Sequence, residues 1–231
     1  MSPSTETIKS ASNAPTLRET AIRRHRSLGL VPGCLLLTLA AFLLWNEVLK
    51  YRFVAKRWGI VVPGAIYRSG QVSKWVLKDK LKEHKIQVII DLNGIDSHDE
   101  HQVAEIKTAR RLGIGHHRFP LSGDGTGDIR NYAKAIQVLA DCQHEGKAVL
   151  VHCAAGAQRT GGVVAAFRVL LHGESPQRAY AELSQYGWKA HKDQDLLTYL
   201  NSHMRELAEI LVEMQVIDQV PEPLPDLGPE P

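Results

Sequence analysis

Short apolar runs alternate with longer amphipathic stretches over most of the chain. Runs such as Ile86–Asp91 and Ala148–Val151 are apolar and contain several β-branched residues, which is typical of buried strands. The stretches between such runs place apolar residues three and four positions apart, as an amphipathic helix does. From Asp128 to Cys142, this apolar stripe consists of Ile129, Tyr132, Ala135, Ile136 and Leu139.

The complete pattern predicts a regular alternation of strands and helices. In chain order, we expect a short strand ending near Arg68, a helix Ser73–His84, a strand Ile86–Asp91, a helix Ser97–Leu112, a strand His117–Phe119, a helix Asp128–Cys142, a strand Ala148–Val151, and helices Gly162–Leu171, Pro176–Tyr186 and Asp193–Val216. This order favours an α/β fold with a central parallel or mixed sheet of about four to five strands between helices. Ligands of such sheets bind beyond the carboxyl ends of the strands.

An uncharged apolar run precedes this α/β region. Residues 28–45 carry no charge and follow the basic residues Arg23, Arg24 and Arg26. Their length is close to the roughly 20 residues that cross a bilayer as a helix. We therefore predict a single-pass membrane protein with a transmembrane anchor at 28–48, and we keep a cleaved signal peptide and a buried core helix as alternatives. Positive charges flank both ends of the run, so the positive-inside rule does not assign a membrane side to the following domain.

The composition of the remaining chain predicts its folded and disordered segments, and it argues against nucleic-acid binding and a metal site. We expect a disordered basic tail at 1–27, a juxtamembrane linker at 49–60, a folded domain at 61–216 and a disordered Pro-rich tail at 217–231. The 231 residues carry a net charge of only +3 and contain no long Lys/Arg run, which argues against a nucleic-acid partner. The three cysteines do not suggest a disulfide framework, and no zinc-like spacing is present. We therefore expect no metal and no cofactor.

The segment with the most specific chemistry joins the apolar run Ala148–Val151 to the helix Gly162–Leu171. Its loop consists of small residues, so an anion can approach the backbone N–H groups at the start of a helix. Gly156 permits a positive φ within the loop. The planar guanidinium of Arg159 matches two oxygens of a phosphate. We expect phosphate to be bound by Ala154, Ala155, Gly156, Ala157, Gln158 and Arg159.

The same positive field acts on Cys153, at the end of the strand. Thiols at helix N-termini or near cations have pKa values of roughly 3.5–7.5, against about 8.5 for a free cysteine. Cys153 would then be a thiolate at neutral pH and a nucleophile at the base of a phosphate site. This arrangement indicates transfer of a phosphoryl group to sulfur and then to water. The hydroxyl of Thr160 can stabilise the sulfur when it leaves in the second step.

The motif His152-Cys153-x5-Arg159-Thr160-Gly161 resembles the signature of the cysteine-dependent protein phosphatases, in particular the atypical dual-specificity phosphatases of bacteria and fungi. The likeness extends through Ile66–Gln71 and Val88–Leu92 and covers about Val61 to Tyr186. It implies a phosphotyrosine phosphatase-like fold at 61–216. It also implies hydrolysis of phosphotyrosine in a protein or peptide substrate through a cysteinyl-phosphate, and leaves phosphoserine and phosphothreonine open as substrates.

The resemblance also implies a general acid, an Asp on a mobile loop about thirty residues before the cysteine. Asp124 lies between glycines in the corresponding loop and is our first candidate. Asp128 begins the next predicted helix and is the alternative acid, although a helix cap explains it better. In the family, the residue matching His152 orients the cysteine. Asp91 and Arg68 are expected to be structural supports.

Two other functions compete with protein phosphatase activity. A lipid or inositide phosphatase has a similar loop, but its loop normally carries lysines where this chain has Ala154, Ala157 and Gln158. Without that charge, polyphosphorylated inositides should bind poorly. The second alternative is an inactive phosphate-binding scaffold, which the presence of Cys153, Arg159 and Thr160 disfavours.

Overall fold

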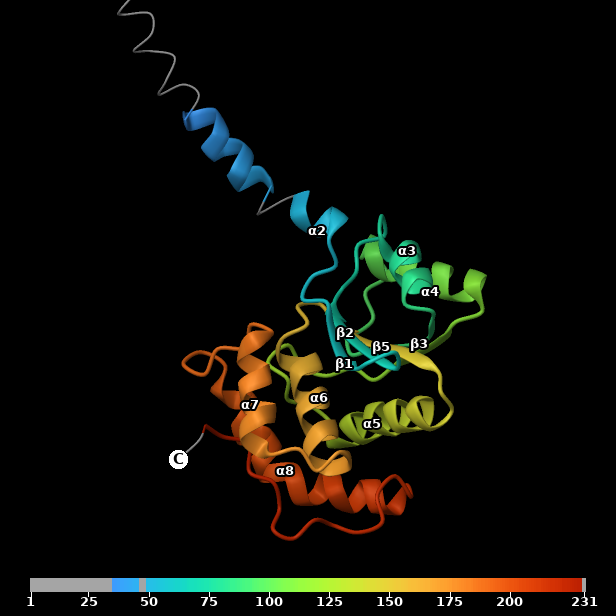
Figure 1. The fold of residues 1–231 in the computed structure, drawn as a ribbon, viewed down its shortest axis with the longest axis vertical. Helices are drawn as coiled ribbons and strands as arrows, with labels where there is room; N and C mark the ends of the chain where they lie inside the picture. Colours follow the sequence, from blue (N-terminus) through green and yellow to red (C-terminus); the bar gives the residue numbers. More distant parts are fainter. Residues whose placement is uncertain (1–34, 46–48, 230–231) are drawn as a thin grey trace, which may run out of the picture. The chain divides into compact units, whose positions relative to one another are not determined.

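The computed structural model describes residues 35–45 and 49–229. The chain divides after Lys50 into two compact units. The second unit contains a five-stranded sheet in the order β1-β2-β5-β3-β4 (Figure 1). β1 is antiparallel to β2 and all other pairs are parallel. The strands are β1 (Gly59–Val62), β2 (Ile66–Gly70), β3 (Ile86–Asp91), β4 (Gly115–Arg118) and β5 (Ala148–Cys153). The predicted α/β class and the mixed sheet are therefore confirmed.

Helices cover both faces of this sheet (Figure 1). One face packs against α3 and α4, and the other against α5 and α6, with α7 against α6 and α8 against α5. The helices are α2 (Lys50–Phe53), α3 (Leu77–Glu83), α4 (Glu100–Leu112), α5 (Ile129–His144), α6 (Gln158–Leu171), α7 (Pro176–Gln185) and α8 (Gln194–Glu213). The two faces give two hydrophobic cores, one on each side of the sheet.

The position of β5 in the middle of the sheet explains why its sequence is a continuous apolar run rather than an alternating one. Val149 and Val151 belong to the core beneath α5 and α6, whereas Leu150 belongs to the core with α3. Successive side chains of a strand point to opposite faces, and both faces are covered here. All six residues of β5 are buried, so the strand delivers Cys153 at a fixed position.

Hydrogen bonds at the N-terminus set the start of α4 and α3. Asp99 accepts the backbone N–H groups of His101 and Gln102, so α4 begins at Glu100 rather than at Ser97. Residues 73–76 form a turn in which Ser73 O accepts the N–H groups of Val76 and Leu77, and α3 starts after it. The predicted helix Ser73–His84 is therefore shorter in the structure.

The predicted transmembrane anchor is corrected by the structure. Of the predicted span, the structure describes residues 35–45, of which residues 35–44 are helical. Within residues 35–45 and 49–229, no helix is long and apolar enough to cross a membrane. Residues 1–34 and 46–48, which include the predicted N-terminal tail and both ends of the predicted span, lie outside the described residues.

Both segments flanking the predicted domain take part in the fold. The predicted linker 49–60 contains α2 and the first residues of β1. After α8, the Pro-rich segment expected to be disordered packs on that helix up to residue 229. The side-chain amide of Asn201 bonds both the N–H and the C=O of Leu227 (2.9 Å each), and Leu227 is buried. The bidentate amide, the buried side chain of Leu227 and an ion pair between Arg205 and Glu222 (3.1 Å) therefore hold this segment against α8.

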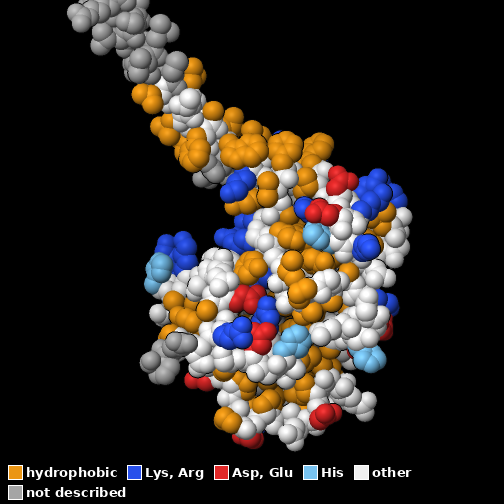
Figure 2. Space-filling view, in the orientation of Figure 1, with side chains coloured by type: hydrophobic (Ala, Val, Ile, Leu, Met, Phe, Trp, Pro, Cys, Tyr) orange, Lys and Arg blue, Asp and Glu red, His pale blue; other side chains and the backbone are white. Residues whose placement is uncertain are grey.

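The surface carries no single dominant charge on the face shown in Figure 2. Lys and Arg side chains lie next to Asp and Glu side chains there, and apolar side chains separate them. This mixture agrees with the small net charge of +3.

Candidate active site

Cys153 ends β5, between the ends of two neighbouring parallel strands. In the register of the sheet, Cys153 pairs with Gly70 of β2, and His152 pairs with Asp91 of β3. The chain then passes through the phosphate loop, residues 153–160, and continues as α6 from Gln158. The predicted strand, loop and helix are therefore present, with the loop at the carboxyl edge of the sheet.

Three consecutive carbonyl groups of the phosphate loop point out of the loop. Each accepts a hydrogen bond from another part of the chain: Ala154 O from the backbone N–H of Gln71 (3.2 Å), Ala155 O from Arg57 (2.8 Å) and Gly156 O from Arg68 (3.3 Å). The N–H of each peptide points opposite to its C=O. The loop N–H groups are therefore turned inward, and that of Gly156 donates to Cys153 Sγ at 3.1 Å.

Steric constraints make Gly156 indispensable for this loop conformation. Its φ is +74°, and a Cβ there would lie 2.4 Å from the backbone N of Gly70 and 2.7 Å from the carbonyl carbon of Ser69. The loop therefore rests directly on the end of β2. Gly70 is constrained from the other side, because its own Cβ would lie 2.9 Å from Ala155 O.

Cys153 is almost fully buried, and its surroundings favour the thiolate. Burial raises the pKa of the thiol, but the hydroxyl and N–H of Thr160, the charge of Arg159 and the N–H of Gly156 outweigh burial and lower it. Thiolate nucleophiles depend on such electropositive surroundings. The electrostatics therefore agree with the role predicted for Cys153, whereas Cys142, which lies on α5, has a pKa raised mainly by burial.

The Arg159 guanidinium lies beside the loop with donors to spare. Its Nη1 donates to Leu92 O at a long 3.4 Å, and its Nε is buried without an acceptor among the described residues. Buried donors of this kind normally have partners. An anion above Cys153 would supply them, which agrees with the predicted phosphate contact.

The two glycines after Thr160 make room for neighbouring side chains. A Cβ at Gly161 would lie 2.8 Å from Leu183 of α7, and a Cβ at Gly162 would lie 2.5 Å from the hydroxyl of Tyr132 on α5. Both helices can therefore approach the first turn of α6 closely.

Arg68 supports the phosphate loop from beneath, as expected for a structural residue. Its side chain is fully buried, pairs with Glu182 of α7 at 2.9 Å and lies 3.8 Å from the ring centre of Tyr186. Because Nη2 of Arg68 also holds Gly156 O, this residue connects α7 to the loop. Asp91 is likewise structural, since it pairs with Arg118 at 2.7 Å and accepts the N–H of Asn93.

The predicted acid Asp124 lies in the acid loop, residues 121–128, between β4 and α5. Its carboxylate is exposed and accepts the N–H (2.9 Å) and hydroxyl (2.8 Å) of Thr126, which lower its pKa. The next residue, Gly125, approaches the phosphate loop, because a Cβ there would lie 3.4 Å from Gln158. Asp124 is therefore beside the site with its carboxylate turned to its own loop. Asp128 caps α5 by accepting the N–H of Arg130 at 2.9 Å.

Two tyrosines that the sequence did not single out for the site hold the acid loop. Tyr132 of α5 donates to Gly125 O, and Tyr199 of α8 donates to Gly127 O. The sequence assigns Tyr132 only to an apolar stripe, and nothing in its spacing indicates that its hydroxyl reaches back to the preceding loop.

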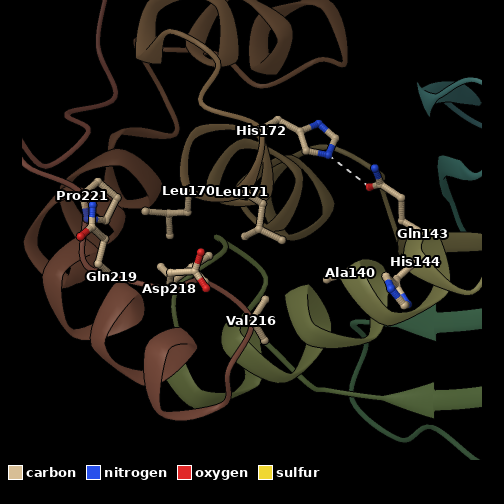
Figure 3. A pocket seen from close by; sticks show the side chains of 11 residues that line it. Ala140, Gln143, His144, Leu170, Leu171, His172, Val216, Asp218, Gln219 and Pro221 are labelled. Carbon is tan, nitrogen blue, oxygen red and sulfur yellow. Dashed lines mark hydrogen bonds between the residues drawn. The ribbon is translucent and has the colours of Figure 1, made fainter.

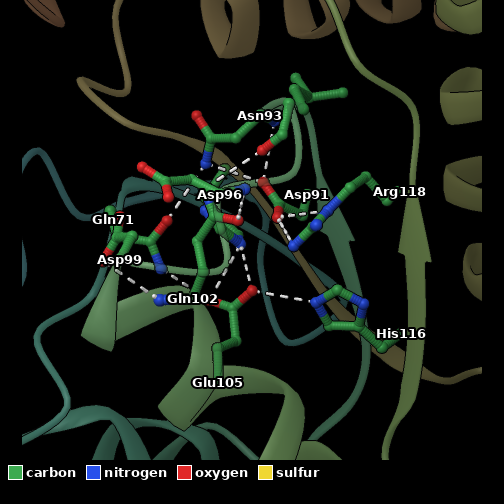
Figure 4. A network of polar contacts seen from close by, with 12 residues as sticks. Gln71, Asp91, Asn93, Asp96, Asp99, Gln102, Glu105, His116 and Arg118 are labelled. Carbon is green, nitrogen blue, oxygen red and sulfur yellow. Dashed lines mark hydrogen bonds and ion pairs between the residues drawn. The ribbon is translucent and has the colours of Figure 1, made fainter.

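His152 contacts a buried carboxylate that the sequence also left unrecognised. Glu105 of α4 is fully buried, and its oxygens bond the imidazoles of His116 (3.0 Å; Figure 4) and His152 (3.1 Å). The buried residues of α4 are Gln102, Glu105 and Ala109, two of which are polar. A helix whose inward stripe is partly polar is the only signal that could have indicated this cluster.

A cavity of about 910 Å³ lies at the opposite end of α6 (Figure 3). It is lined by residues of the α5 and α6 C-termini, such as His144 and His172, and by the segment after α8, such as Asp218. Since α6 starts at Gln158 and ends at Leu171, about 20 Å of helix separates this cavity from the phosphate loop. It is therefore not part of the candidate active site.

Three solved structures illustrate the fold that this chain shares with other proteins. P. aeruginosa TpbA has a TM-score of 0.55 and 17% identity, over 68% of this chain and 91% of that one. The core catalytic domain of the PP-IP phosphatase SIW14 from S. cerevisiae has a TM-score of 0.55 and 19% identity, over 75% and 99%. PTPMT1 has a TM-score of 0.52 and 17% identity, over 69% and 98%. At these identities, the likeness establishes the fold.

Comparison with curated proteins finds no match. The model of the family described as "Dual specificity phosphatase, catalytic domain" matches residues 68–210, which is more than half of the chain and includes both loops. The chain therefore belongs to the dual specificity phosphatase family, and its folded unit is a hydrolase domain that acts on phosphoesters.

Proposed function

We propose that the protein hydrolyses phosphotyrosine in proteins or peptides through a cysteinyl-phosphate intermediate. The observation that carries this proposal is the convergence on Cys153 Sγ of inward-facing loop N–H groups and an Arg159 side chain with an unsatisfied donor. A phosphate dianion fits such a site because N–H groups and a guanidinium surround its oxygens.

The reaction proceeds in two displacements at phosphorus. In the first, the Cys153 thiolate forms an S–P bond while the P–O bond to the substrate breaks, and Asp124 gives its proton to the leaving oxygen. In the second, water forms a new P–O bond, its proton passes to Asp124, and the thiolate leaves with the support of Thr160. Arg159 and the loop N–H groups bind the transferred oxygens in both steps.

Asp124 requires a change of the acid loop to act as the proposed acid. In the described conformation, its bonds to Thr126 stabilise the carboxylate and lower its pKa. Replacing these bonds by the leaving oxygen of a bound substrate, in a site that excludes water, would raise the pKa and allow the carboxyl group to hold a proton.

An inositide phosphatase is the second candidate, favoured by the shared fold with SIW14, which is described as a PP-IP phosphatase. The shared fold with TpbA supports the first candidate, since one structure of TpbA holds pTyr (TM-score 0.52, 16% identity). Within the phosphate loop of this chain, positions 154, 157 and 158 carry no positive charge to meet additional phosphates. This difference ranks the phosphotyrosine substrate first.

The test compares phosphate release from a phosphotyrosine peptide, the matching phosphoserine peptide and a phosphoinositide, with the Cys153→Ser variant as control. We expect the highest kcat/KM for the phosphotyrosine peptide and no hydrolysis by Cys153→Ser, because a hydroxyl at this position is not ionised. Faster release from the inositide would replace the first candidate by the second. Hydrolysis by Cys153→Ser at the wild-type rate would refute the nucleophile.

A further inference from the structure

The buried carboxylate of Glu105 accepts hydrogen bonds from three side chains, of which Figure 4 labels His116 and Gln71. The donors come from three separate segments: His152 Nε2 on β5 at 3.1 Å, His116 Nε2 on β4 at 3.0 Å, and Gln71 Nε2 just after β2 at 3.1 Å. α4 thereby reaches across the ends of the strands to the residue before the nucleophile. The chemistry assigned to the phosphate loop does not use this carboxylate.

The charges of Glu105 and His152 depend on each other. Burial raises the pKa of Glu105, but the charge of His152 and the bonds from both histidines outweigh it and lower the pKa to about 2. Burial lowers the pKa of His152, but Glu105 outweighs burial and raises it to about 9. The pair is therefore a carboxylate and an imidazolium at neutral pH. A buried charge without such a partner would be strongly destabilising.

The position of the His152 ring also depends on this contact. Its other nitrogen, Nδ1, is buried and has no hydrogen-bond partner among the described residues. The bond to Glu105 is thus the ring's orienting hydrogen bond within that part of the chain. The charge of Cys153 further raises the pKa of His152, so the imidazolium and the thiolate stabilise each other.

We propose that Glu105 is a positioning residue for the nucleophile, which fixes the ring of His152 and keeps it charged beside Cys153, and thereby favours the thiolate. This inference rests on the proposed role of Cys153. It assigns a function to a residue on a different element, far from the signature in sequence.

Other charged groups limit the size of the expected effect. Asp91 of β3 also faces His152 and raises its pKa, but its carboxylate is paired with Arg118. His116 shares the carboxylate with His152. On α4 itself, His101 lies one turn before Glu105, and its Nδ1 accepts the N–H of Lys74 (3.3 Å). Loss of Glu105 therefore removes the main, but not the whole, negative field at His152.

The test uses Glu105→Gln in the full chain, because glutamine keeps the size and the acceptor oxygen but removes the charge. The pKa of the thiol is measured from the pH dependence of inactivation by iodoacetate. We expect it to rise by about one pH unit, so alkylation below the pKa slows about tenfold, and the acidic limb of kcat/KM moves by the same amount. A folded Glu105→Gln protein with the wild-type thiol pKa would overturn the inference.

The matched control is His116→Gln, which removes the other histidine from the same carboxylate. If Glu105 acts through His152, this control leaves the thiol pKa unchanged. An equal shift in both variants would mean that any disturbance of the cluster affects the thiol, and would also overturn the inference.

Two further measurements keep the test decisive if Glu105→Gln folds poorly or if the proposed nucleophile is wrong. If Glu105→Gln folds poorly, the double variant Glu105→Gln/His152→Gln replaces it, because this variant leaves no buried charge without a partner. Its thiol pKa should equal that of His152→Gln alone. If the shifts of the two single variants add instead, Glu105 does not act through His152. Cys153→Ser separates the two hypotheses. Retained hydrolysis refutes the nucleophile, whereas complete loss combined with an unchanged thiol pKa in Glu105→Gln refutes only the positioning role.

Discussion

The phosphate loop and the acid loop lie side by side but are held in different ways. The carbonyl groups of residues 154–156 in the phosphate loop are bonded by donors from three other segments, and the loop rests on backbone atoms of β2. In the acid loop, Gly123, Asp124 and Asp128 are exposed. That loop is attached to the helices by two tyrosine hydroxyls at Gly125 and Gly127.

This difference corresponds to what each loop has to do in the proposed reaction. A site that stabilises charge on phosphate works best when its donors are already in place, since no reorganisation is then needed. A group that delivers a proton to a variable leaving oxygen must be able to adjust. At Gly156 the phosphate loop accepts no side chain, whereas in the acid loop a side chain at Gly123 would meet nothing, although Gly125 and Gly127 have positive φ there.

The largest effect should come from adding one methyl group to the phosphate loop. Gly156→Ala places a Cβ against the backbone of Gly70 and Ser69 at a positive φ. We expect a loss of about 3 kcal/mol in the free energy of unfolding and a fall in kcat/KM of about 1000-fold. Urea denaturation and steady-state kinetics measure the two effects.

The same substitution in the acid loop is the control. A Cβ at Gly123 meets nothing within 4 Å, and its φ is not positive. Gly123→Ala should therefore leave the free energy of unfolding unchanged within about 0.5 kcal/mol. Equal destabilisation by the two variants would contradict the contrast between the loops.

An intermediate effect is expected from Asp124→Asn. The loss of the proposed general acid should reduce kcat about 100-fold for phosphotyrosine, whose leaving oxygen needs a proton. For an aryl phosphate with a strongly acidic leaving group, the reduction should be much smaller. Measurement of kcat against the pKa of the leaving group therefore distinguishes loss of the acid from misfolding, which would affect all substrates alike.

Asp128→Asn is the counterpart for the alternative acid. Asparagine caps helices about as well as aspartate, so α5 should keep its first turn and its stability. We expect nearly wild-type kcat for all leaving groups. If this variant shows the leaving-group dependence and Asp124→Asn does not, Asp128 is the acid.

A smaller effect than that of Asp124→Asn should come from Tyr132→Phe, which removes the hydroxyl that holds Gly125 O. One buried hydrogen bond contributes about 1 kcal/mol, so we expect kcat to fall about fivefold through misplacement of the acid loop. The iodoacetate reactivity of Cys153 should remain unchanged, because the phosphate loop does not depend on this bond. A lowered reactivity would show that the two loops are coupled.

The sequence by itself determined the α/β fold and the phosphate loop. β5 is a continuous apolar run because both of its faces are covered, and Gly156 is required by contacts with neighbouring backbone. Such constraints act between residues close in the chain, or on single positions that accept one residue type, so they leave a local pattern. The same reasoning placed a transmembrane anchor at 28–48, and this prediction was wrong. An apolar run predicts burial or a helix, but within residues 35–45 and 49–229 no helix is long and apolar enough to cross a membrane.

Tertiary structure alone decided which side chains reach the two loops. Glu105 was hidden in a helix of mostly polar residues, Arg57 in a predicted linker, and Tyr132 in an apolar stripe. Each reaches its partner through a side chain whose direction depends on how distant elements pack, and no spacing in the sequence records that direction. For the same reason, the choice between Asp124 and Asp128 remains a prediction. The backbone N–H groups that bind phosphate follow from the local chain, whereas the groups that orient them belong to Arg57, Arg68 and Gln71, which are far from the loop in sequence.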